Sequence, residues 1–171
     1  MKKNNIILVA GLVALIVLAG IAIGTNIIGS KILVRTANKD FQKDLEFYRE
    51  LGNHFVEQGK YDDAIAAYEA GLLLSQDKDM MNNLAVIYYK QGRYSEAISW
   101  LKKLIELEEG NPSYHYDLAV NLVDRFRNSK EQSLDDLLEA LKEYERAEEL
   151  EPGYAYAKEN IEVLRTVLKL E

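Results

Sequence analysis

The 171-residue sequence contains no cysteine, only two prolines and only two histidines. Without cysteine, the chain has no disulfide, no thiolate metal site and no thiol nucleophile. His54 and His115 are not spaced as ligands on one helical face, so we expect no metal. The sequence also lacks a phosphate-binding loop, a nucleophile elbow and a zinc-protease helix motif. We therefore expect no cofactor, no catalytic residue and no enzyme activity.

Acidic residues are missing from the first 36 positions, which hold Lys2, Lys3, Lys31 and Arg35. The rest of the chain carries 17 basic and 28 acidic residues, a net charge of −11. Phosphate backbones and anionic lipid headgroups repel a domain of this charge. Nucleic acid is therefore a poor candidate for a partner.

Residues 6–24 are an uninterrupted apolar run of 19 residues. At about 1.5 Å per helical residue, this run spans the hydrocarbon core of a bilayer. A cleaved signal peptide is the alternative, with Ala22 to Gly24 as the cleavage site, but its apolar region is ordinarily about 7–15 residues long. We predict a single-pass anchor over residues 1–28, followed by a juxtamembrane linker over residues 29–39.

We predict the orientation of this anchor from the short basic tail that precedes it. The positive-inside rule gives no clear answer, because basic residues flank both ends of the run. A very short basic tail before a long apolar run is typical of a signal-anchor, so we expect a bacterial cell-membrane protein with its acidic domain outside the cytoplasm. Gly20 and Gly24 form a G-x-x-x-G pair that favours close packing of two such helices.

The remaining residues repeat themselves. The segment from Gly59 to Ala64 (GKYDDA) recurs 33 residues later from Gly92 to Ala97 (GRYSEA). A Leu followed by a small residue also recurs, at Leu51, Leu84 and Leu118, which lie 33 and 34 residues apart. Apolar residues at helical spacing before each turn glycine, and the small Ala after it, predict pairs of antiparallel helices that must stack on their neighbours.

These residues resemble the tetratricopeptide repeat family in the order and spacing of aromatic, Leu, Gly, aromatic and Ala positions. The resemblance implies an all-α solenoid over residues 40–171, with three helical hairpins over about 45–77, 78–111 and 112–153. We expect residues 154–170 to form an amphipathic helix that caps the exposed end.

The third repeat departs from the family pattern. Phe126 replaces the turn glycine, and residues 128–133 indicate an inserted loop. Asn111, followed by a proline, predicts an N-cap for the first helix of this repeat. Ser133 and Asp136 predict a capping box at the start of its second helix.

The resemblance implies that the first helices of the repeats line a concave, peptide-binding surface. Two interpretations of its apolar side chains stay open: they contact a bound helix or extended peptide, or they pack between neighbouring first helices. The residues expected on this surface are Arg49, Asn53, Val56, Asn82, Asn83, Val86, Tyr89, Lys90, Tyr116, Val120 and Val123.

One subfamily with this fold clamps the C-terminal carboxylate of chaperone tails. Arg49, Asn53 and Asn83 fall at three of its five clamp positions, but Ser113 and Asp117 stand where the other two are basic. Asp117 repels a carboxylate, so the opposite charge preference is an equally good interpretation. We expect a membrane-tethered adaptor or assembly co-factor that binds protein segments; a homo-oligomeric membrane subunit is the alternative.

Overall fold

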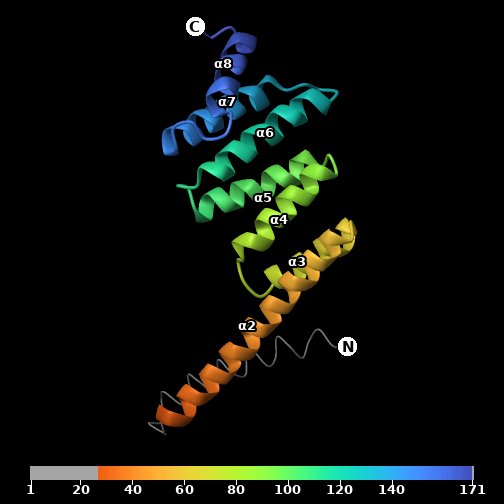
Figure 1. The fold of residues 1–171 in the computed structure, drawn as a ribbon, viewed down its shortest axis with the longest axis vertical. Helices are drawn as coiled ribbons and strands as arrows, with labels where there is room; N and C mark the ends of the chain where they lie inside the picture. Colours follow the sequence, from red (N-terminus) through yellow and green to blue (C-terminus); the bar gives the residue numbers. More distant parts are fainter. Residues whose placement is uncertain (1–26, 171) are drawn as a thin grey trace. The chain divides into compact units, whose positions relative to one another are not determined.

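The computed structural model describes the backbone of residues 27–170 and the side chains of residues 38–170. This part of the chain is built from α-helices joined by short connections (Figure 1). The helices are α2 (Ile27–Glu57), α3 (Tyr61–Leu72), α4 (Lys78–Lys90), α5 (Tyr94–Leu107), α6 (Pro112–Asn128), α7 (Leu134–Leu150) and α8 (Ala157–Leu168). Three helical pairs and a final helix are thus present, which confirms the predicted tetratricopeptide-type architecture.

The chain divides into two compact units, residues 1–47 and residues 48–171, and their boundary falls within α2. In the first unit, residues 29–39 are helical where the sequence predicted a linker. The predicted membrane helix over residues 6–24, with Gly20 and Gly24, lies outside the described residues. Within residues 27–170, none of the helices combines the length and the apolar character needed to cross a bilayer.

The two glycines of the repeated segment form the same turn in each of the first two hairpins. Gly59 and Gly92 both have a φ of +71°, a left-handed conformation that glycine adopts at little cost. The N–H of Gly59 donates to the carbonyl of Val56 at 3.0 Å, and that of Lys60 donates to Phe55 at 2.9 Å. Equivalent bonds follow Gly92, so α2 and α4 both end in a Schellman motif.

Polar side chains cap two first helices. Asp77 accepts from the N–H of Met80 at 2.9 Å and begins α4, and Asn111 accepts from the N–H of Ser113 at 3.1 Å and begins α6. The Asn111 cap confirms the sequence prediction. Such caps stabilise a helix by about 1 kcal/mol, because they satisfy a backbone donor that has no partner within the helix.

The capping box predicted at the start of α7 is wrong. Ser133 occupies the N-cap position but makes no side-chain cap bond. The Asp136 carboxylate instead accepts two hydrogen bonds from Arg125 of α6, at 2.9 Å to Nε and 2.6 Å to Nη2. This two-bond ion pair ties α6 to α7 next to the inserted loop, and sequence spacing alone gave no sign of it.

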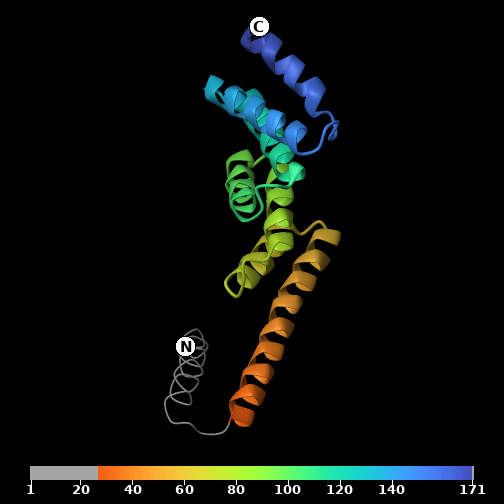
Figure 2. The ribbon, with the colours of Figure 1, turned by 90° about the vertical axis from the view of Figure 1, so that its left-hand side faces the viewer.

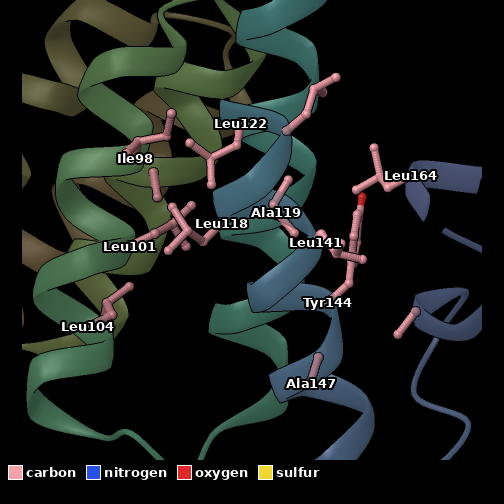
Figure 3. Close-up of a cluster of buried hydrophobic side chains, with 14 of the residues drawn as sticks. Ile98, Leu101, Leu104, Leu118, Ala119, Leu122, Leu141, Tyr144, Ala147 and Leu164 are labelled. Atoms are coloured by element: carbon pink, nitrogen blue, oxygen red, sulfur yellow. The ribbon is translucent and has the colours of Figure 1, made fainter. Parts of the chain in front are cut away.

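In the second unit, each helix from α3 to α8 packs against the next one in the chain (Figure 2). Small residues lie where first and second helices meet: Ala85 of α4 is 3% exposed and Ala119 of α6 is fully buried. Leu101, Leu118 and Tyr144 fill the space around them (Figure 3). Burial of each large apolar side chain stabilises the stack by roughly 1.5–3 kcal/mol. Leu164 of α8 extends this core, as expected of a capping helix.

Candidate functional site

A largely apolar hollow lies between the first helices of the second and third repeats. Its volume is about 330 Å³, and α4 and α6 supply most of its walls while Leu101 of α5 forms part of its base. Val86 and Tyr89 remain 40% and 38% exposed there. The lining residues are Asn82, Ala85, Val86, Tyr89, Leu101, Tyr116, Asp117, Val120 and Asn121.

A second, smaller hollow of about 220 Å³ continues this surface between α6 and α8. Val120 lines both hollows, whereas the predicted residue Val123 lines only the second. Asn160 and Val163 of α8 form the opposite wall. We call the two hollows together the groove, which runs from α4 over α6 to α8. Helix α8 thus stands where the first helix of a fourth repeat would lie.

The predicted residues nearer the first repeat are bonded within the protein. Arg49 donates to Asp77 at 2.6 Å, so its guanidinium is paired within the protein. Asn53 accepts from the Tyr68 hydroxyl at 2.6 Å and from Asn83 at 3.2 Å, and Asn83 also donates to Tyr68 at 3.1 Å. The three residues at chaperone-clamp positions are therefore all bonded within the protein, in two separate sets of contacts that link the first two repeats.

Two further predicted residues lie apart from both hollows. Lys90 is the exposed last residue of α4, and its Nζ lies 6.0 Å from the centre of the Tyr61 ring. Val56 is half-buried near the end of α2. Neither side chain lines the groove.

Asp117 lies on the wall of the first hollow with little to neutralise it. Within residues 38–170, its carboxylate accepts one side-chain hydrogen bond, from the Ser113 hydroxyl at 3.4 Å, and takes part in no ion pair. Burial raises the pKa of Asp117 above its ordinary value, and the bond from Ser113 opposes that shift. The two positions that depart from the clamp pattern thus bond to each other.

Asp124 lies about two helical turns beyond Asp117 on α6. In contrast to Asp117, its carboxylate has both a hydrogen-bond donor and a cation beside it. It accepts from the Tyr89 hydroxyl at 2.8 Å and lies 3.6 Å from the Arg127 guanidinium. The hydrogen bond to Asp124, together with burial, raises the pKa of Tyr89 to about 12. Tyr89 is therefore a neutral donor at physiological pH, held in place at the rim of the hollow.

Aromatic contacts fix the other side of the first hollow. The Tyr116 ring packs edge-on against Tyr144 at 5.3 Å and against Tyr154 at 5.8 Å between centroids. Such edge-to-face pairs favour one ring orientation. Tyr116 therefore packs within the repeat array, as the second interpretation of the apolar residues predicts. Val86 and Tyr89 remain exposed, as the first interpretation, contact with a bound peptide, requires.

Sequence reasoning missed Asn121 as a groove residue. Its side chain is 4% exposed, its amide nitrogen donates to the Asp117 carbonyl at 2.8 Å, and its Oδ1 has no partner within the described residues. Buried polar atoms without a hydrogen bond are rare in native proteins. Asn121 is four residues beyond Asp117 and so shares its helical face, which was the available signal.

Comparisons with known proteins agree with this architecture. Residues 37–112 match the family model for the tetratricopeptide repeat. Over 119 residues the chain is 35% identical to human RNA polymerase II-associated protein 3, a match that covers 67% of this chain but only 16% of that protein.

Two solved structures extend the comparison. The first repeat domain of Spaghetti (RPAP3), bound to the HSP90 peptide SRMEEVD, is 25% identical with a TM-score of 0.60 and covers 74% of this chain and 94% of its own. The crystal structure of MamA shares the fold at 23% identity, with a TM-score of 0.63. The match covers 74% of this chain and 65% of the MamA chain. The chain is therefore a tetratricopeptide repeat protein, distantly related to the RPAP3 repeat domains.

Proposed function

We propose that this protein is an adaptor or assembly co-factor that binds a polypeptide segment in the groove and carries out no catalysis. The observation that carries the proposal is the hollow between α4 and α6, where the large side chains of Val86 and Tyr89 stay exposed. A repeat domain similar to this chain is bound to the HSP90 peptide SRMEEVD, which supports peptide binding here.

Membrane attachment is the second part of the proposal. The apolar run over residues 6–24 has the length of a membrane helix, and a basic tail precedes it. Tethering raises the effective concentration of the groove for segments at the same membrane. Membrane proteins, or chains leaving a translocation or assembly machine, are therefore the partners that we propose.

Site-specific photocrosslinking in cells tests the groove. We expect a benzoylphenylalanine at position 89 to form discrete protein adducts, because Tyr89 stands at the rim of the hollow. Adding Val86→Glu and Val120→Glu places two charges on the apolar lining and should reduce those adducts at least tenfold. Helicity, measured by circular dichroism, should persist, because both side chains are at least partly exposed.

Position 156 supplies a matched control. Tyr156 is 68% exposed and lines neither hollow, so benzoylphenylalanine there should give no comparable adduct. Equal crosslinking at positions 89 and 156, or adducts that survive the two glutamates, would show that the groove is not the binding surface.

Self-association is the second candidate, and one observation favours it. Val163 and Val167, one turn apart on α8, are 56% and 57% exposed at the end of the array. Together with Gly20 and Gly24 of the predicted anchor, they offer surfaces for a second copy. A monomer in mild detergent, measured by light scattering, excludes this alternative.

A further inference from the structure

The first hollow combines apolar walls with hydrogen-bond acceptors that are short of donors. Val86 and Val120 supply aliphatic surface from α4 and α6, and the Asp117 carboxylate lies on the same wall. Within the described residues that carboxylate receives one long hydrogen bond, the 3.4 Å contact from Ser113. A buried or half-buried anion without a cationic partner is costly to a folded protein, and such residues ordinarily pair with an opposite charge.

Asn121 adds an independent observation. It lines the same hollow, is 4% exposed, and presents an Oδ1 that no described residue satisfies. Its nitrogen is already committed to the Asp117 carbonyl, so the oxygen cannot exchange roles with it without losing that bond. Asp117 and Asn121 thus create a local excess of acceptors at one place.

Nearby acids do not share this property. Asp124 on the same helix receives the Tyr89 hydroxyl and pairs with Arg127, and Asp136 receives two bonds from Arg125. The protein therefore supplies donors to acids that neighbour Asp117 along α6 and α7. The shortage of donors is confined to the wall of the hollow, which is where a ligand would supply them.

We propose that the hollow receives a lysine or arginine side chain of the bound peptide, with its aliphatic stem against Val86 and Val120 and its charged head at Asp117. This inference rests on the proposed function and specifies its ligand. Long basic side chains match such a site because they bury an apolar stem and carry only donors at the head. The net charge of −11 over residues 37–171 attracts the same class of peptide.

The opposite ligand, an acidic tail with a free carboxylate, fits poorly. Arg49 and Asn53 are engaged within the protein, and Asp117 occupies a position where the chaperone-tail clamp has a basic residue. The related domain that binds SRMEEVD and this chain should therefore select peptides of opposite charge.

The test compares peptides that differ at one position. The full-length chain, kept in solution with a nonionic detergent, is titrated against fluorescein-labelled, end-blocked Gly-Ala-Leu-Lys-Leu-Ala-Gly, and against the same peptide with norleucine in place of lysine. Fluorescence anisotropy gives the Kd of each. We expect the lysine peptide to bind roughly ten- to a hundredfold more tightly, the range of a charge-assisted hydrogen bond.

Asp117→Asn should abolish that preference while leaving the norleucine Kd within about twofold, because the amide keeps the shape and the acceptor for Ser113. Asp79→Asn is the matched control: it removes the same charge from an exposed site on α4 outside the groove, and it should keep the preference. Thermal unfolding followed by circular dichroism checks that both variants fold.

The outcomes separate this inference from the proposed function. Equal binding of both peptides, lost in Val86→Glu, would keep the groove as a peptide site and overturn its cation preference. Tighter binding of SRMEEVD than of the lysine peptide, or an Asp79→Asn effect equal to that of Asp117→Asn, overturns the preference as well. Binding of no peptide at millimolar concentration overturns both proposals.

Discussion

At the scale of single residues, Asp117 differs from two neighbouring acids, Asp124 of α6 and Asp136 of α7, in the donors that surround it. Asp124 and the Arg125–Asp136 pair are satisfied within the fold, whereas Asp117 has one weak donor and a raised pKa. A carboxylate in this condition is tolerated when it serves binding, because binding sites commonly sacrifice some stability for function. A substitution of Asp117 should therefore remove the proposed ligand preference without lowering the stability of the fold.

Replacing Asp117 with Asn should maintain or raise the melting temperature at pH 7. Burial raises the pKa of this carboxyl, so between its unfolded and folded pKa the native state binds more protons than the unfolded state. Stability therefore falls as pH rises through that window, and above it the charged form carries a constant penalty. Asn removes the penalty, and its advantage over the native residue should shrink as the pH falls through the window.

Thermal unfolding of the native chain and of Asp117→Asn at a series of pH values measures this difference. Asp79→Asn, which changes an exposed acid, serves as the control for net charge. If Asp117→Asn lowers stability at neutral pH by more than about 1 kcal/mol, the carboxylate stabilises the fold, and burial is not its dominant interaction.

At the scale of helices, close approach is set by the small residue that follows Leu51, Leu84 and Leu118. In the first hairpin that residue is Gly52, where an added Cβ would lie 2.3 Å from Cε1 of the fully buried Tyr68 ring. The equivalent positions in the next two hairpins are alanines. The Tyr68 ring thus leaves no room for a methyl group at position 52, and only glycine fits there.

Gly52→Ala should destabilise the protein by roughly 1–3 kcal/mol, because the ring of Tyr68 cannot move without breaking its bonds to Asn53 and Asn83. Urea unfolding followed by circular dichroism measures the loss. Gly110→Ala is the control: an added Cβ meets nothing within 4 Å there, so stability should be unchanged or slightly higher. An equal effect of both substitutions would show that the exchange of glycine for alanine in itself, not the contact with Tyr68, decides the result.

Local signals made most helices predictable from the sequence. The turn at Gly59 and its copy at Gly92 depend on five or six consecutive residues, and Asn111 caps the helix that it precedes, so each could be inferred where it stands. The capping box predicted from Ser133 and Asp136 was wrong, because the spacing of these two residues does not determine whether Asp136 bonds locally or to a residue of another helix. The Asp136 carboxylate binds Arg125, a choice that depends on how α6 and α7 pack.

The groove was less predictable, for the same physical reason. Helical periodicity placed Asn82, Val86 and Val120 on one face, and all three line the first hollow. Periodicity cannot say which polar residues find partners across repeats, so the engagement of Asn53 and Asn83 by Tyr68 emerged only from the structure. Helix α8 contributed a further wall, although the sequence indicated only a cap.

At the scale of the whole molecule, the partners of the proposed membrane-tethered adaptor depend on which side of the membrane its repeat domain would occupy. Residues 6–24 predict an anchor, and a basic tail before it indicates a domain outside the cytoplasm. Exported or envelope proteins are then the available partners. With the opposite orientation, the same groove recruits cytoplasmic proteins to the membrane. The ligand preference proposed for Asp117 is independent of this choice, because it depends on contacts within α4 and α6.

A single cysteine decides the orientation, because the chain has none of its own. Lys130 is exposed in the loop between α6 and α7, away from the groove, so Lys130→Cys should leave binding unchanged. We expect a membrane-impermeant maleimide to label this variant in intact cells as fully as after lysis. Labelling only after lysis would place the domain in the cytoplasm and direct the partner search to soluble proteins. Release of the labelled chain from washed membranes without detergent would instead show that residues 6–24 are not a retained anchor.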